Sequence, residues 1–306
     1  MADGPARTPV VPRDVVRADA SGALASAEDR VAVEEPLEIR VAGDAIAVTM
    51  RTPGEDSALA VGFLFAEGVI RDRTDVGSVA HCTRPGDEDH GNAIDVRPGA
   101  GVALDVERSR RGTLTTAACG VCGRRSIDDL LARCRPLASE ATIPWSLLRE
   151  STAHLARAQR HFAATGGLHA ALVLDTYGTT LAFAEDVGRH NAVDKAIGRL
   201  VLDGVVGAPG ARTNGAPHDG SASPLLLVVS GRISFEIVQK AVVAGIPCVA
   251  GVSAPTSLAV DLARATGLTL AGFVRDGSLN LYAHAERVSH EPPRPSTRAD
   301  GRQSGP

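Results

Sequence analysis

The residues best suited to chemistry are Cys119 and Cys122, a Cys-x-x-Cys pair within TTAACGVCGRRSIDDL and two of only five cysteines in the chain. Two cations, Arg124 and Arg125, follow the pair, and a short helix is predicted to begin at Ser126. Cations and a helix N-terminus favour the charged sulfur, and such settings lower a cysteine pKa from about 8.5 to roughly 3.5–7.5. The stretch therefore predicts a nucleophilic thiolate.

Other uses of such a pair fit the chain less well. Structural zinc needs four ligands, commonly two such pairs, whereas no second pair occurs and His81 and Cys82 are adjacent. We therefore expect no metal held by the protein. A thioredoxin-like redox pair would follow the first strand of a βαβ unit, but this one ends a mostly β region. Two small buried residues in a turn are the structural alternative, which suits Cys134 and Cys248 better.

A second group of polar residues, EDVGRHNAVDKAIG, lies at a predicted strand-to-helix junction and contains Arg189 and His190. Gly188 suits a tight turn, and amides at a helix start can hold an anion. The structural alternative is a solvated helix entry with Asp–Lys pairing. The density of different polar types at the carboxyl end of a strand favours a site.

Two neighbouring strand ends carry hydroxyls and backbone amides. In VVSGRISFEIVQK the strand ends at Ser230, Arg232 follows and Ser234 is a candidate cap; GVSAPTSLAVDLA repeats the arrangement. In FVRDGSLNLY, Asp276-Gly277 predicts a hairpin turn, and Arg275 is suited to a phosphate. Together they predict a phosphorylated ligand across the top of a sheet. His169, at a strand start, is more often a structural residue.

Composition limits the function classes. The chain has 306 residues, 44% hydrophobic and 22% charged, so two modest domains with real cores are expected. A net charge of -4 and 3% aromatics argue against a nucleic-acid partner. An odd cysteine count, the lack of a signal sequence and no apolar run of about 18 residues predict a soluble, cytoplasmic protein without a membrane partner.

The secondary-structure elements that must position these residues follow two different patterns along the chain. We expect a disordered arm over 1–30, then a smaller β-rich N-terminal domain over 31–144 that ends in the Cys-x-x-Cys loop and short helix. It begins with a hairpin at Gly43-Asp44, a buried helix capped by Gly68 and a second hairpin at Pro98-Gly99. Strand–helix alternation over 145–286, starting with a helix across 145–164, predicts an α/β domain. Residues 207–224 are expected to be a mobile insertion, and 287–306 a disordered tail.

Seven stretches in order give the chain a family resemblance. EEPLEIRV, TPGEDSALAVGFLFAEGVI, ACGVCG, GGLHAA, EDVGRHNAVDKAIG, SGRISFEIVQKA and SAPTSLAVDLA together resemble the FdhD/NarQ family of formate dehydrogenase accessory sulfurtransferases. The resemblance implies an α+β protein whose C-terminal domain is a cytidine deaminase-like three-layer α/β/α sandwich, and a homodimer. It also implies an enzyme that takes persulfide sulfur from a cysteine desulfurase. The sulfur would pass to the molybdenum cofactor, bis(molybdopterin guanine dinucleotide), for formate dehydrogenase.

Carried over residue by residue, the resemblance makes Cys119 the persulfide-bearing cysteine and Cys122 its partner. It assigns the cofactor contact to one short segment, namely Phe273, Val274, Arg275, Asp276, Gly277 and Ser278. Arg189, His190, Ser230 and Arg232 are the further candidates for holding the cofactor phosphates.

Three rival functions are considered. A zinc deaminase would need a Pro-Cys-x-x-Cys motif, and GIPCVAG has no second cysteine. A non-catalytic molybdenum-cofactor chaperone for formate dehydrogenase would need the anion sites without reactive sulfur. A thiol–disulfide oxidoreductase is the third.

Overall fold

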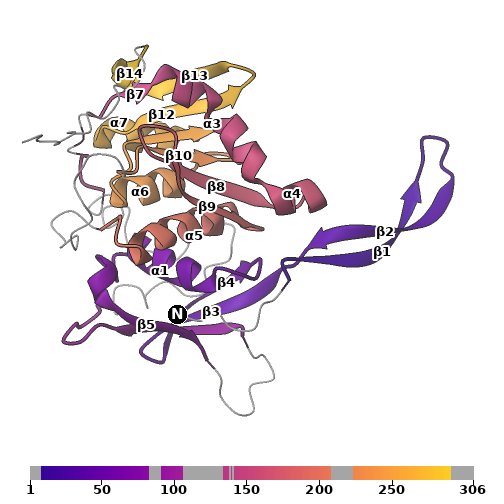
Figure 1. The fold of residues 1–306 in the computed structure, drawn as a ribbon, viewed down its shortest axis with the longest axis horizontal. Coiled ribbons are helices and arrows are strands. Elements are labelled where there is room, and N and C mark those ends of the chain that lie inside the picture. The colour runs from indigo at the N-terminus through magenta and orange to yellow at the C-terminus, as the bar shows by residue number, and fades with distance from the viewer. Residues whose placement is uncertain are drawn as a thin grey trace, which may run out of the picture.

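The computed structural model describes residues 8–82, 91–105, 134–137, 139, 141–207 and 223–290. Figure 1 shows a large sheet with helices, a smaller sheet next to it and a long hairpin that extends from the body. The strands are β1 Val10–Ala18, β2 Leu24–Ala32, β3 Glu35–Val41, β4 Asp44–Arg51, β5 Val76–His81, β6 Ala93–Pro98, β7 Ile143–Pro144, β8 His169–Leu174, β9 Thr180–Asp186, β10 Leu226–Val229, β11 Cys248–Gly251, β12 Thr269–Arg275, β13 Ser278–Ala283 and β14 Val288–Ser289. The helices are α1 Asp56–Ala66, α3 Trp145–Ala158, α4 Arg160–Thr165, α5 Arg189–Leu202, α6 Phe235–Val243 and α7 Ser257–Thr266, with 3-10 turns at Arg73–Asp75 and Ala285–Arg287.

The large sheet has the order β13-β12-β11-β10-β8-β9. Strands β10, β11 and β12 are parallel; β8 pairs antiparallel with β10, β9 antiparallel with β8, and β13 antiparallel with β12. Strands β10 and β11 are short apolar runs, LLVV and CVAG, and every residue in them is buried. Such unbroken apolar strands are expected where both faces of a sheet are covered.

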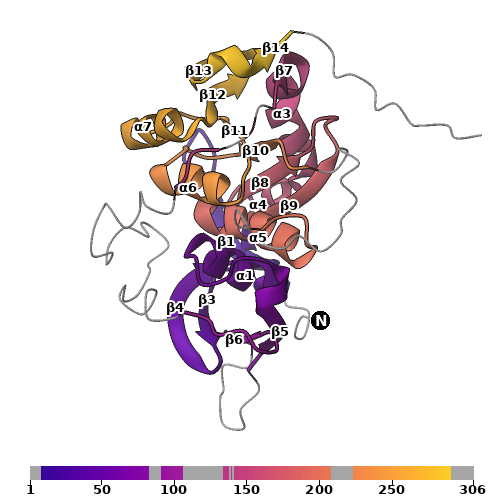
Figure 2. The same ribbon diagram turned by 90° about the vertical axis from the view of Figure 1, so that its left-hand side faces the viewer.

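Helices cover both faces. Helix α3 packs on one face through Leu148 and Leu155, which share a cluster with Leu172, Val228 and Cys248. Helices α5, α6 and α7 pack on the opposite face, as the two views agree (Figures 1 and 2). The predicted mixed α/β character is confirmed, and the likeness to the cytidine deaminase fold stays a prediction.

The smaller sheet has the order β4-β3-β6-β5. The hairpin predicted at Gly43-Asp44 is confirmed, with Gly43 at φ 91° between β3 and β4. The second hairpin, predicted at Pro98-Gly99, is wrong. Strand β6 pairs with β3 and β5 instead, and residues 99–105 form no strand. Pairing with the preceding strand β5 and with the more distant β3 buries Ile94 and Val96.

Helix α1 connects the two sheets. Its sequence is apolar nearly all round, and it lies between the small sheet and α5 (Figure 2). The two helices approach closely at two glycines, because a Cβ on Gly62 would lie 1.9 Å from the Asp194 carbonyl oxygen and one on Gly198 would lie 1.9 Å from that of Ala58. One apolar cluster therefore runs from the small sheet into the large one. The two-domain division stays a prediction.

The expected disordered arm over 1–30 is wrong for residues 10–30, which belong to the β1–β2 hairpin. Valines favour strands, and the turn is closed by Asp19, whose carboxylate accepts the backbone N–H groups of Ser21 and Ala23. The tail expected from 287 is also wrong at its start. There β14 pairs with β7, and Arg287 donates to the Ser139 carbonyl.

The single helix predicted over 145–164 is two helices. The chain leaves helical geometry at Gln159, with ψ 78°, and α4 follows until Gly166, φ 65°. The Glu185 carboxylate accepts the N–H groups of His161 and Phe162 at this break, at 3.0 and 2.8 Å. A carboxylate from a distant part of the chain therefore accepts the first N–H groups of α4, and the local sequence gives no sign of this contact.

Cys134 and Cys248 are buried, as their predicted structural role requires, and burial raises the pKa of the Cys248 thiol. Among the helices of the described residues, none is both long and apolar enough to cross a membrane. The predicted Ser126 helix, residues 208–222 of the predicted insertion and residues 291–306 lie outside the described residues.

We predict that Gly62→Ala lowers the free energy of unfolding by about 2–3 kcal/mol, because the added methyl group forces α1 and α5 apart. Gly167→Ala is the matched control, since its Cβ would make only ordinary contact, 3.6 Å from the Ala32 Cβ. Urea unfolding of both variants measures the difference. Equal stability of the two variants would contradict the close approach of the helices.

Candidate functional site

The carboxyl ends of β10 and β11 form one continuous edge. After β10, Ile233 donates its N–H to the Ala254 carbonyl, 3.1 Å, and its own carbonyl accepts the Thr256 N–H, 2.9 Å. After β11, the Ser253 carbonyl accepts the Phe273 N–H from β12 at 3.3 Å. The strand ends that the sequence singled out therefore lie side by side. Ligands of open α/β sheets commonly bind at such an edge.

Capping at the two following helices differs from the prediction in one case. Thr256 caps α7, since its side-chain oxygen accepts the Ala259 N–H at 3.4 Å. Ser234 stands at the N-cap of α6 but makes no capping bond with its side chain. Its hydroxyl lies 3.0 Å from His190 Nε2 instead. Tertiary contact with α5 redirects this side chain.

Ser230, His169 and Arg189 meet around Gly231. The Ser230 hydroxyl oxygen accepts the Ala170 N–H at 2.9 Å. A Cβ on Gly231 would lie 3.3 Å from His169 Nδ1 and 3.7 Å from Arg189 Cδ. Burial, reinforced by the charge of Arg189, lowers the pKa of His169. Its imidazole is therefore neutral near pH 7, with one donor and one acceptor nitrogen.

A cavity of about 420 Å³ opens at this edge. It is lined by Gln159, Phe162, Gly166, Gly167, Leu168, His169, Ser230 and Val252. The volume lies within the range of small-molecule sites. Of this set, the sequence predicts Ser230 as a site residue and His169 as a structural residue, whereas Gln159 and Phe162 carry no signal of their own. Glycines in GGLHAA were the available signal for the cavity rim.

His190 faces α6. Its Nε2 lies 3.1 Å from a carboxylate oxygen of Glu236, as well as close to Ser234. One turn further along α5, the Asp194 carboxylate pairs with the Lys240 ammonium. Burial raises the pKa of Asp194 to about 6, although Lys240 opposes the shift. A buried charge cluster therefore joins α5 to α6.

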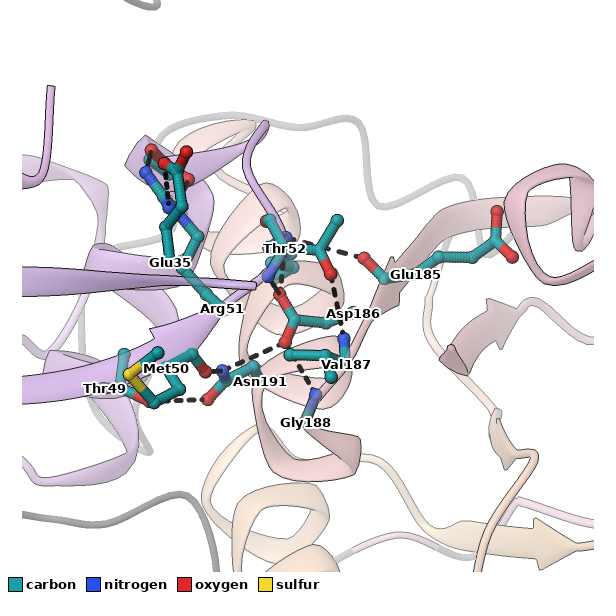
Figure 3. A network of polar contacts seen from close by, with 12 residues as sticks. Glu35, Thr49, Met50, Arg51, Thr52, Glu185, Asp186, Val187, Gly188 and Asn191 are labelled. Carbon is teal, nitrogen blue, oxygen red and sulfur yellow. Dashed lines mark hydrogen bonds and ion pairs between the residues drawn. The ribbon is translucent and has the colours of Figure 1, made fainter. Parts of the chain in front are cut away.

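The remaining polar residues of EDVGRHNAVDKAIG anchor the structure (Figure 3). The Asp186 carboxylate accepts the N–H groups of Thr52 and Gly188 and the side-chain amide of Asn191, at 3.1, 2.8 and 3.1 Å. Lys195 Nζ lies 2.7 Å from the same carboxylate. Both charges are buried. The Asp–Lys pairing of the structural alternative is therefore present, but the pair is buried and not solvated.

The predicted hairpin turn at Asp276-Gly277 is confirmed, with φ values of 51° and 76° between β12 and β13. Arg275 is exposed and its guanidinium lies 5.9 Å from the centre of the Phe273 ring. The Ser278 hydroxyl donates to the Arg275 carbonyl at 3.0 Å, and Val274 is buried. Arg275 is thus free of carboxylate partners within the described residues.

Of the remaining predicted site residues, Arg232 is exposed just beyond Gly231. Cys119 and Cys122 lie outside the described residues.

The raised pKa of Asp194 predicts a stability change with pH. Between about pH 4 and 6 the folded state keeps this carboxyl protonated, whereas the unfolded chain, with a pKa near 3.8, releases the proton. Stability therefore falls as pH rises through this window, by roughly 3 kcal/mol. Asp194→Asn should remove this fall in urea unfolding measured from pH 4 to 7. Parallel pH profiles for the wild type and Asp194→Asn would contradict it.

Comparison with known proteins gives a consistent picture. The FdhD/NarQ family model matches residues 32–289. The sulfur carrier protein FdhD of Anaeromyxobacter dehalogenans strain 2CP-C is 55% identical over 263 residues, 85% of this chain and 88% of its own. That of Streptomyces coelicolor is 44% identical over 274 residues, with 88% and 92% covered.

A crystal structure assigned as a formate dehydrogenase accessory protein, from Desulfotalea psychrophila, has a TM-score of 0.68 at 21% identity. It covers 92% of this chain and 100% of its own. At that identity the likeness supports the fold alone. The family model spans most of the chain, and the chain therefore belongs to the FdhD/NarQ family.

Proposed function

We propose that this protein is a cytoplasmic, homodimeric sulfurtransferase. It carries persulfide sulfur from a cysteine desulfurase to the molybdenum cofactor, bis(molybdopterin guanine dinucleotide), for formate dehydrogenase. The observation that carries the proposal is the family match over residues 32–289 to relatives named sulfur carrier proteins, in a chain that contains a Cys-x-x-Cys pair flanked by arginines.

The proposed transfer has two steps. The Cys119 thiolate attacks the terminal sulfur of the desulfurase persulfide, an S–S bond forms on Cys119, and the desulfurase cysteine leaves as its thiolate. Cys122 then attacks the inner sulfur of the Cys119 persulfide, which releases the terminal sulfur toward the cofactor. The resulting disulfide needs a dithiol reductant to return to two thiols.

The cofactor is the substrate that receives the sulfur. Its guanine dinucleotide ends carry phosphates, and the edge formed by β10, β11 and the β12–β13 hairpin offers cations for them. Arg189, His190, Ser230 and Arg232 would bind phosphate at one part of this edge, and Phe273–Ser278 would bind it at the hairpin. Arginine can hold two phosphate oxygens at once, which supports Arg189 and Arg275 as the main contacts.

A non-catalytic cofactor chaperone is the second candidate. The same anion-binding edge favours it, because a chaperone needs the edge and no reactive sulfur. The fate of the thiols separates the two functions.

We predict that incubation with a cysteine desulfurase and cysteine adds the mass of one sulfur atom to the intact protein, reversibly under reductant. Cys119→Ala should abolish the gain, because a low-pKa thiolate is the acceptor. Cys82→Ala is the matched control, since Cys82 is a free, half-buried cysteine in the described residues. It should keep the full gain.

An unmodified wild-type mass beside an active desulfurase would shift the assignment to the chaperone. Full restoration of formate dehydrogenase activity by Cys119→Ala, in cells that lack the protein, would rule out sulfur carriage through this residue.

We also predict that Arg275→Ala weakens the binding of GDP about tenfold, because it removes a bidentate donor at the hairpin. Titration calorimetry at low salt measures the change. Arg160→Ala, which removes an exposed arginine on α4, is the control and should bind as the wild type does. Equal binding by Arg275→Ala and the wild type would remove Arg275 from the site.

A further inference from the structure

A long hairpin extends from the body of the protein, and no third strand of the described residues pairs with it. Strands β1 and β2 form a sheet of their own, and Figure 1 shows this hairpin, the arm (Val10–Ala32), projecting away from both larger sheets. Each of its strands has nine residues, which gives a length of about 30 Å. An isolated two-stranded hairpin is only marginally stable in water. The arm therefore needs a surface that covers it.

Acidic and apolar side chains share one face of the arm. Asp14 lies directly opposite Glu28, and residues two apart on a strand point to the same side. Val16 and Leu24 therefore lie on this acidic–apolar face too, with exposed fractions of 65% and 72%. Arg30 shares the face nearer the base, yet it forms no ion pair with either carboxylate. Like charges directly opposite each other are unfavourable, so this face lacks both a counter-charge and a cover.

The opposite face of the arm is already balanced. It carries Arg13 directly opposite Asp29, and Arg17 Nη2 lies 3.6 Å from the Asp29 carboxylate. Val15 and Val31 lie on this side and are half-buried. The acidic–apolar face is therefore the one that needs a partner.

A surface of matching chemistry lies on α3 and α4. Helix α3 packs on the large sheet through one side, so its other side faces outward. An exposed surface there, the α3–α4 surface, includes Ala153, Ala156, Arg157, Phe162 and Ala163. Arg157 belongs to no ion pair within the described residues, because Glu150 of the same helix pairs with Arg149 at 2.8 Å. The surface is thus mostly apolar and carries an available cation.

The arm and the α3–α4 surface are complementary in charge and in apolar content. Three of the five large apolar side chains that are exposed in the described residues lie on them, namely Val16, Leu24 and Phe162. One surface offers two carboxylates and the other an arginine. Small alanine side chains on α3 let a hairpin approach closely. Exposed apolar groups next to opposite charges are typical of a protein interface.

The position of the arm suits an exchange between two copies. Both surfaces belong to the same chain, so a pair of copies can make the contact twice about a two-fold axis. The arm leaves the body beside α4, where a Cβ on Gly167 would lie 3.6 Å from the Ala32 Cβ. An axis near this base directs each arm over α3 and α4 of the other copy. The two nine-residue strands and the α3–α4 surface together approach the roughly 20–30 residues per side of a standard interface.

We infer that the acidic–apolar face of each arm packs on the α3–α4 surface of a second copy. Asp14 and Glu28 then face Arg157, while Val16 and Leu24 cover Phe162. The inference deepens the proposed function and rests on it for the homodimer, to which it assigns the interface. Phe162 also lines the cavity. The arm of the partner therefore forms part of the cavity wall, and the site is complete only in the dimer.

Sedimentation equilibrium of the full-length protein, over a micromolar concentration series, measures the dimer Kd. Glu28→Arg and Arg157→Glu should each raise this Kd about tenfold or more, because each places like charges across the interface. The double variant Glu28→Arg/Arg157→Glu should return to within about threefold of the wild type, since opposite charges face each other again. Asp261→Arg, the same kind of charge change at an exposed position of α7, is the matched control and should alter the Kd by less than about twofold.

Glu28→Arg also separates the interface from the stability of the arm. It replaces the like-charged pair with Asp14 by an opposite pair, which favours the hairpin itself. A weaker dimer in this variant therefore cannot come from a damaged arm.

Cross-linking locates the contact. With benzoylphenylalanine in place of Val16, irradiation of a mixture of isotope-labelled and unlabelled protein should join the arm of one copy to the peptide of the other copy that contains Phe162. Mass spectrometry of the digested product identifies the joined peptides.

Four outcomes would overturn the inference: a monomeric wild type, a Kd unchanged in both single variants, a double variant that does not recover, and cross-links outside α3 and α4. Sulfur loading of Cys119, measured on the same proteins, tests the proposed function separately. A dimer that loads sulfur and ignores both charge reversals would keep the proposed function and remove the arm contact. A dimer that responds to both reversals without loading sulfur would do the opposite.

Discussion

The buried Asp186 carboxylate is the interaction on which the arrangement of the site depends. It accepts hydrogen bonds from Thr52, Gly188 and Asn191 and pairs with Lys195. Because a buried carboxylate is costly without partners, these four residues are held in place around it. Removing one partner of a buried ion pair commonly costs about 3–5 kcal/mol. Thr52 follows β4, whereas Asp186 ends β9. The contact therefore fixes the small sheet relative to the helix start that carries Arg189.

The pairing of buried charges also determines which donors have no partner at the edge of the large sheet. Carboxylates in this region are occupied by backbone N–H groups, by Lys195, by Lys240 or by His190. Arg189 Nε and the amide Nε2 of Gln159 have no hydrogen-bond partner among the described residues. Buried polar groups in folded proteins are nearly always paired.

The two halves of the proposed chemistry make different demands. Sulfur transfer needs an accessible thiolate with a depressed pKa, which is a local property of a cysteine and its nearest charges. Holding an anionic cofactor needs donors from separate elements at fixed spacing, which in the proposed function are the start of α5 and the loop after β10. The residues for the thiolate lie in one short stretch of sequence, whereas the donors for the cofactor lie far apart along the chain.

The sequence by itself determined the elements whose signals are local. It predicted the β3–β4 hairpin at Gly43, the buried helix α1 and the turn at Asp276-Gly277, because glycine geometry and hydrophobic pattern act within a few residues. It also identified the strand ends at Ser230 and Ser253 and, through seven ordered motifs, the family. Tertiary structure alone decided the pairing of β6 with β3 and β5, the break of the helix at Gln159 and the partner of Ser234. It likewise decided that Gln159, His169 and Ser230 line one cavity. Each of these depends on a group far along the chain, such as Glu185 for the helix break and His190 for Ser234, and long-range partners leave no periodic signal in the sequence around either residue.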